Sequence, residues 1–234
     1  MVVSHERSGT HFLINALGEA YGYPNAQFVM FDEPALAINY FDPAVVAQTI
    51  TAIAAQRRGS VIKSHHAAEF FQGTLPRVTR DVMIFYVYRH PADVMISFWR
   101  FMHRWTWREG PRLPGALAFA MAEPEGHMLR YQMRQRSSML ERWAAHVDTW
   151  MEAAATNRRI VPVRFEDLRD SYVATIGGLS ALIGRPPRSV QPPDPNRYVI
   201  KGAPPESLEQ PDRDAIARLA KREVGGTMRR FGYL

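Results

Sequence analysis

The chain has 234 residues, enough to bury the core of one domain, and its 46% hydrophobic and 22% charged residues are typical of globular proteins. No apolar run approaches the roughly 20 residues of a membrane span, the first residues do not form a signal peptide, and the absence of Cys excludes disulfides and thiol catalysis. We therefore expect a single cytoplasmic domain over residues 1–234 that does not contact a membrane. The net charge of +6 favours an anionic partner such as a nucleotide or a nucleic acid.

The chain begins with a predicted strand at Val2-Val3, followed by a polar turn and a helix whose apolar residues, 12–17, have helical spacing. This geometry aims backbone N–H groups and the positive helix end at one place, which suits a phosphate or sulfate. Gly9 lets the backbone approach such an anion closely. The side chains that can donate hydrogen bonds to it are Arg7, Ser8 and Thr10. The nucleotide-binding pattern G-x-x-x-x-G-K-S/T is absent, which argues against an ordinary ATP or GTP site. The structural alternative to an anion site is an ordinary strand-to-helix turn.

Beyond an irregular segment through Glu33-Pro34, hydrophobic periodicity predicts strands and helices in alternation. The predicted strands cover residues 60–63, 82–88 and 160–164, and the predicted helices cover residues 42–59, 91–101, 137–155, 172–183 and 211–223. The alternation predicts an α/β fold with a central parallel sheet flanked by helices. Pro162 places its strand near a sheet edge. In such sheets ligands lie beyond the carboxyl ends of the strands.

Polar residues directly follow the strand predicted at residues 60–63. Lys63 can neutralise charge on a leaving phosphate oxygen, and His65, with an ordinary pKa of about 6.5, can take a proton from a hydroxyl at neutral pH. A strand-end Lys beside surface His residues is the structural alternative. No His-x-x-x-His or Glu-x-x-His spacing supports a zinc site, so we expect no metal.

A second anion site is predicted after the strand at residues 82–88. Arg89 ends this strand, and Ser97 lies about two turns along the next helix, so that both can reach one phosphate. A buried structural Arg and an ordinary helical Ser would give the same pattern. Because the carboxyl ends of parallel strands share one sheet edge, we expect residues 7–10, residues 63–65 and Arg89 to lie together.

Together these segments resemble the sulfotransferases that use 3′-phosphoadenosine 5′-phosphosulfate (PAPS) and release adenosine 3′,5′-bisphosphate (PAP). Residues 7–13, RSGTHFL, are similar to the phosphosulfate loop of that family, P-K/R-S-G-T-T-W/F-L. Residues 89–97 resemble its second nucleotide motif, R-N/D-P-x-D-x-x-x-S. Residues 163–168 resemble its R/Y-Y/F-E-D-L/M segment, and residues 143–150 resemble its W-x-x-H-V-x-x-W helix. The resemblance covers about residues 2–202 and implies a three-layer, P-loop-like α/β fold.

The resemblance also implies a PAPS-dependent sulfotransferase with a role for each matching residue. The residues that would hold the 5′-phosphosulfate are Arg7, Ser8, Gly9 and Thr10, with Lys63 in contact with it. His11 would face the sulfate, and Phe12 would stack on adenine. The residues that would bind the 3′-phosphate are Arg89, Ser97, Lys201 and Gly202. His65 would be the general base, with Lys63 and Arg7 stabilising the developing charge, and no metal is required.

The chain departs from the family pattern at several positions. Glu6 replaces the usual Pro, and His11 replaces the second Thr. Ile200 stands where the family has Arg, and Arg197 is the candidate to replace it within a Pro-rich segment, about residues 185–210, that is expected to cover the cofactor.

Residues 99–136 interrupt the sheet pattern and are expected to form the acceptor side. Trp105, Trp107 and Met102 favour an apolar acceptor body, whereas the Arg residues between 100 and 142 suit a carboxylate or phosphate, or lie on solvated helix faces. We expect a small-molecule acceptor with a hydroxyl or amine and no nucleic acid. The competing interpretations are a nucleotide-dependent small-molecule kinase and a non-catalytic module that binds nucleotides or nucleic acid.

Overall fold

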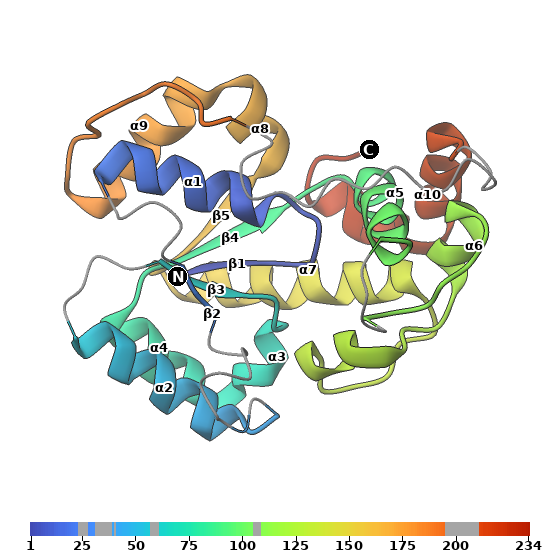
Figure 1. The fold of residues 1–234 in the computed structure, drawn as a ribbon, viewed down its shortest axis with the longest axis horizontal. Helices are drawn as coiled ribbons and strands as arrows, with labels where there is room; N and C mark the ends of the chain where they lie inside the picture. The colour runs from blue at the N-terminus through green and yellow to red at the C-terminus, as the bar shows by residue number, and fades with distance from the viewer. Residues whose placement is uncertain (23–27, 31–38, 40, 57–60, 105–108, 195–210) are drawn as a thin grey trace.

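The computed structural model describes residues 1–22, 28–30, 39, 41–56, 61–104, 109–194 and 211–234. At its centre lies a five-stranded sheet in the order β2-β3-β1-β4-β5, in which every pair of neighbouring strands is parallel (Figure 1). The strands are β1 Val2–Ser4, β2 Phe28–Met30, β3 Val61–Ser64, β4 Ile84–Tyr88 and β5 Ile160–Arg164. The predicted parallel α/β sheet is therefore confirmed, and β5, which contains Pro162, is an edge strand as expected.

The prediction of an irregular segment after the first helix was wrong at one point, because β2 lies within it and extends the sheet beyond β3. β2 is only 3 residues long, too short for a periodic pattern to distinguish it from a loop.

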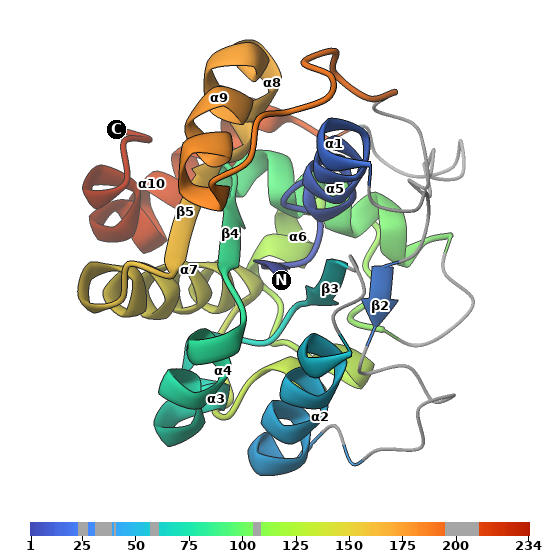
Figure 2. The ribbon, with the colours of Figure 1, turned by 90° about the vertical axis from the view of Figure 1, so that its left-hand side faces the viewer.

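Helices cover both faces of the sheet. The α-helices are α1 Thr10–Tyr21, α2 Pro43–Ala55, α3 Ala68–Phe71, α4 Leu75–Asp81, α5 Pro91–Met102, α6 Ala116–Met121, α7 Met139–Thr156, α8 Phe165–Asp170, α9 Tyr172–Ile183 and α10 Arg213–Arg230, and the 3-10 helices are η2 Gln72–Thr74 and η3 Gly126–Tyr131. Figure 2, turned by 90° from Figure 1, shows α1 and α9 on one side of the strands and α2 and α4 on the other. None of these helices is both long and apolar enough to cross a lipid bilayer.

Side chains of the central strands alternate between the two faces and build a core on each. Val3 and Tyr86 pack with α2, α4 and α7, whereas Val2 and Phe85 pack with α1 and α9. A third apolar cluster joins α5, α6, α7 and α10 beyond the sheet. Because both faces are covered, β1 and β4 are almost entirely buried, which explains their nearly continuous apolar sequences.

Two predicted helix ends show how local sequence sets the boundaries. Asp42 caps α2 by accepting from the Ala44 N–H at 2.8 Å, and Pro43 takes the first helical position, as expected. The last helix was expected to end at Glu223. The structure has a kink at Val224, after which α10 continues to Arg230.

Candidate functional site

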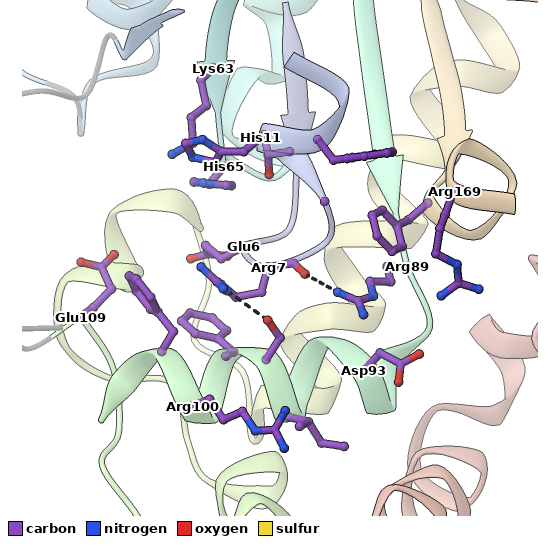
Figure 3. A pocket seen from close by; sticks show the side chains of 18 of the residues that line it. Glu6, Arg7, His11, Lys63, His65, Arg89, Asp93, Arg100, Glu109 and Arg169 are labelled. Atoms are coloured by element: carbon purple, nitrogen blue, oxygen red, sulfur yellow. Dashed lines mark hydrogen bonds between the residues drawn. The ribbon is translucent and has the colours of Figure 1, made fainter. Parts of the chain in front are cut away.

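A cavity of about 1280 Å³ opens at the carboxyl ends of β1, β3 and β4 (Figure 3). Its lining includes residues from all three predicted polar sets: Arg7, Gly9, Thr10, Lys63, His65, Arg89 and Ser97. Single small-molecule sites are typically about 300–1,000 Å³, so this cavity is large enough for a nucleotide and a second molecule. The expectation that the three sets lie at one edge of the sheet is confirmed.

The loop between β1 and α1 turns sharply through two residues with positive φ. Arg7 has φ 65° and Gly9 has φ 104°, and α1 begins at Thr10 immediately afterwards. A side chain at Gly9 would collide with Phe165 of α8, since a Cβ there would lie 2.2 Å from Phe165 Cδ2. The first backbone N–H groups of α1 have no partner within the helix and lie beside the cavity. They can therefore donate to an anion bound there, as the sequence predicted.

Arg7 and Arg89 bring two guanidinium groups close together. Arg7 Nε donates to Ser97 Oγ at 3.1 Å, and its guanidinium lies 4.9 Å from the centre of the Phe101 ring. Arg89 Nη1 donates to the carbonyl oxygen of Arg7 at 3.4 Å (Figure 3). Its guanidinium lies over the Phe165 ring. Burial, and then the neighbouring Arg89, lowers the pKa of Arg7 to about 10. The two anion positions predicted from sequence are thus adjacent, and Arg7 reaches Ser97, which was assigned to the second of them.

His65 is buried at the end of β3 with one defined role for each ring nitrogen. Its Nδ1 lies 2.9 Å from the carbonyl oxygen of Ser4, which only accepts, so Nδ1 carries the hydrogen and Nε2 keeps a lone pair. Burial, followed by the charge of Lys63, holds the pKa of His65 well below its ordinary value. His65 is therefore neutral at pH 7 and able to accept a proton.

Helix α7 fixes the backbone behind these residues. One face of it carries three ring N–H donors, each bound to a carbonyl oxygen at or just beyond a strand end. The pairs are Trp143 Nε1 with Arg89 O at 3.2 Å, His146 Nε2 with His65 O at 3.2 Å, and Trp150 Nε1 with His66 O at 2.9 Å. These are the three ring-bearing positions of the W-x-x-H-V-x-x-W pattern. The pattern was visible in the sequence, but its positioning role was not.

The remaining His, Ser and Phe candidates occupy different environments. His11 lines the cavity, and burial, followed by Lys63, lowers its pKa to about 3. Phe12 also lines the cavity, with its ring edge against Phe165 and Tyr172. Ser8 is buried but does not line the cavity, and its N–H donates to the carbonyl oxygen of His5 at 3.2 Å.

His66 is fully buried beside Phe70, with ring centroids 4.1 Å apart, and does not line the cavity. It is therefore a core residue in this structure.

The expected cofactor cover, about residues 185–210, contributes Pro192, Pro193 and Asp194 to the cavity lining. Pro211 and Arg213, which directly follow this segment, line the cavity as well. Arg213 donates to Asp93 at 2.7 Å and so connects the start of α10 to the start of α5. Lys201, Gly202 and Arg197 lie outside the described residues, so their assignments remain predictions.

The segment predicted to face the acceptor contributes Phe101, Glu109, Arg130 and Tyr131 to the cavity. Several of the Arg residues between 100 and 142 are bound to carboxylates rather than spread over solvated helix faces. The pairs are Arg130 with Glu109 at 2.7 Å, Arg136 with Glu69 at 2.9 Å, and Arg142 with Glu6 at 2.7 Å. Trp105 and Trp107 lie outside the described residues. Within the described part of the chain, no three His, Asp or Glu side chains converge as metal ligands do.

Comparison with known proteins identifies a family and a shared fold. The family model of the sulfotransferase domain matches residues 1–198. The structure of retinol dehydratase with androsterone and inactive cofactor PAP is 12% identical, with 97% of this chain and 79% of that chain covered and a TM-score of 0.58. Its complex with retinol and PAP gives the same identity and TM-score, with 97% and 80% covered.

Mouse sulfotransferase SULT7A1 complexed with PAP is 18% identical, with 79% of this chain covered and a TM-score of 0.49. This chain spans 57% of the length of that protein. No curated protein sequence matches the chain.

Proposed function

Since the chain belongs to the sulfotransferase family, we propose that it transfers a sulfuryl group from PAPS to a hydroxyl or amine of a small-molecule acceptor. The observation that carries this proposal is the convergence of Arg7, Lys63, His65 and Arg89 on one cavity. Three of these residues are cationic, and the fourth is a neutral base. This combination suits an anionic donor and a proton-bearing acceptor.

The cations that line the cavity support a nucleotide that carries two anionic groups. The charge of Arg89 disfavours the charged form of Arg7, and an anion between the two guanidinium groups relieves that repulsion. Arg89 Nε is buried and has no hydrogen-bond partner among the described residues, so an incoming oxygen can satisfy it. We assign the 3′-phosphate to Arg89 and Ser97, and the 5′-phosphosulfate to Lys63 and the first turn of α1 from Gly9.

PAPS supplies the sulfuryl group and leaves as PAP. His65 takes the acceptor proton at Nε2 as the acceptor oxygen or nitrogen bonds to sulfur. Lys63 and Arg7 stabilise negative charge on the sulfuryl and leaving oxygens, as do the backbone N–H groups at the start of α1. The anionic donor offsets the charge of Lys63, so the pKa of His65 rises on binding and the base becomes stronger when it is needed.

The acceptor is proposed to have an aromatic or otherwise apolar body. Ile96, Phe98, Phe101 and Tyr131 supply apolar wall to the cavity. Arg130 already binds Glu109, and also donates to the Tyr131 hydroxyl at 2.7 Å, so it is a poor candidate to select an acceptor carboxylate or phosphate.

Binding of PAP is the first test. PAP at a hundred times its dissociation constant should stabilise the protein by about 2.7 kcal/mol in thermal unfolding. AMP, which lacks the 3′-phosphate, should bind more weakly than PAP. Arg89→Met should remove most of this difference in affinity between PAP and AMP. Equal binding of PAP and AMP by the unsubstituted protein would contradict the assignment of Arg89.

Transfer of labelled sulfate to a panel of phenols, alcohols and amines is the second test. His65→Ala should lower turnover by about 10²–10⁴-fold while PAP still binds. His11→Ala is the matched control, because it removes the other imidazole that lines the cavity. If His11→Ala abolishes turnover and His65→Ala does not, His11 is the base. Activity that requires ATP and Mg²⁺ instead of PAPS would support a kinase.

A further inference from the structure

Glu6 is a buried carboxylate at the edge of the proposed active site. It stands where the family loop has Pro, lines the cavity, and has a side chain that is only 8% exposed. Both of its oxygens accept from Arg142 of α7, at 2.7 and 2.8 Å. Burial raises the pKa of Glu6, but the charge and hydrogen bonds of Arg142 lower it by more. The net pKa lies below its ordinary value, so Glu6 is ionised.

Arg142 is itself held from several directions. Its Nε donates to Gln132 Oε1 at 2.8 Å, and its Nη1 donates to His5 Nε2 at 2.8 Å. The guanidinium is therefore fixed, and it fixes the Glu6 carboxylate in turn.

The end of β1, just before this loop, also holds His65. Ser4, two residues before Glu6, accepts the hydrogen bond from His65 Nδ1. Figure 3 shows Glu6 and His65 projecting into the same part of the cavity. The ring of His65 is thus oriented by the last residue of β1 and faces the charge of Glu6 in the loop that follows.

The surroundings of His65 show why that charge matters. Lys63 on β3 and His11 on α1 both disfavour its protonated form, Glu6 favours it, and the Tyr131 ring covers it at a centroid distance of 5.5 Å. His146 of α7 binds the backbone carbonyl of His65 through Nε2. When His65 takes a proton it becomes an imidazolium beside Lys63, and Glu6 is the resident carboxylate that offsets this cost.

We propose that Glu6, held by Arg142, is a positioning residue that stabilises the protonated form of His65 during transfer. This inference rests on the proposed function, in which His65 is the general base. It assigns a purpose to a residue that departs from the family pattern. Glu6 does not take the proton itself, because both of its oxygens are bound to Arg142.

The test compares Glu6→Gln with the double variant Glu6→Leu/Arg142→Met. Replacing a buried ion pair by apolar residues of similar size often preserves stability, so the double variant separates loss of charge from loss of structure. Both variants should lower kcat by about three- to tenfold, leave the KM for PAPS nearly unchanged, and move the acid limb of the kcat profile to lower pH. Glu69→Gln is the control, because it breaks the ion pair with Arg136 outside the cavity and should leave the acid limb in place.

A titration of the His65 ring by NMR in the PAP complex gives a readout that does not require turnover. The pKa of His65 should fall by about one unit in Glu6→Gln and stay unchanged in Glu69→Gln. An unchanged His65 pKa in Glu6→Gln, or a double variant that regains full kcat together with its thermal stability, overturns the inference. If the unsubstituted protein binds PAP but transfers no sulfate, the proposed function fails, and the NMR titration still decides whether Glu6 acts on His65.

Discussion

Replacing Gly9 by Ala tests whether the loop after β1 has the conformation described. The added Cβ would lie 2.2 Å from Phe165 Cδ2 and 2.7 Å from Cε2, far inside normal contact. Gly9 also has φ 104°, a conformation that costs an Ala residue about 1–2 kcal/mol. Overpacking adds about 1–3 kcal/mol, so we expect Gly9→Ala to destabilise the protein by about 2–5 kcal/mol. For a chain of this length, that lowers Tm by roughly 4–20 °C.

Urea and thermal unfolding of Gly9→Ala provide the assay, with Gly178→Ala as the matched control. Gly178 lies on the exposed side of α9 with nothing within 4 Å of a Cβ, so Ala there should stabilise by about 0.5–1 kcal/mol. Adding Phe165→Ala to Gly9→Ala removes the clash but not the backbone strain. The two substitutions should therefore couple by about 1–3 kcal/mol in a double-mutant cycle. Additive effects, or a Gly9→Ala protein as stable as Gly178→Ala, would refute the loop geometry.

Other predictions concern the buried His residues. His146→Phe removes the hydrogen bonds to the Tyr86 hydroxyl and the His65 carbonyl, so it should cost about 2–4 kcal/mol in urea unfolding and lower kcat more than KM. An unchanged kcat would mean that α7 does not position the base. Burial holds the pKa values of His5, His65 and His146 well below 6.5, so the unfolded chain binds more protons below that pH. Stability should accordingly be retained above about pH 6.5 and fall as the pH drops below it, by up to about 1.4 kcal/mol per His and pH unit. Chemical unfolding from pH 7.5 to 4.5 measures this slope, and a flat profile would contradict the neutral burial of these rings.

The parts of the site that sequence predicts well are those set by short-range rules. A strand end, a Gly and a helix start lie within a few residues of one another, so the order of residues alone locates the loop from Arg7 to Thr10. Lys63 and His65 can be located for the same reason, because they follow a buried strand directly. Parallel pairing then brings such strand ends to one edge, which requires no knowledge of side-chain contacts.

The parts that sequence could not predict depend on contacts across the whole chain. Arg142 appeared as one basic residue among many, and only the fold brings it to Glu6, 136 positions away. The contact between Arg7 and Ser97 spans 90 positions and depends on the left-handed backbone at Arg7, which a non-glycine residue seldom adopts. Periodicity and spacing carry no information about either contact.

The arrangement of α7 explains how the site can be rigid although many of its polar side chains face an open cavity. Figure 1 shows α7 running alongside the sheet, and its donors bind the backbone carbonyls of Arg89 and His65 rather than their side chains. Each of these residues is therefore anchored through its main chain on one side while its side chain stays available on the other. Donors and bases that are fixed before substrate binds need no reorganisation during the reaction. This preorganisation is the source of most electrostatic catalysis. Substitutions on the buried face of α7 should consequently reduce turnover without touching either substrate, and this separates a positioning helix from one that only fills the core.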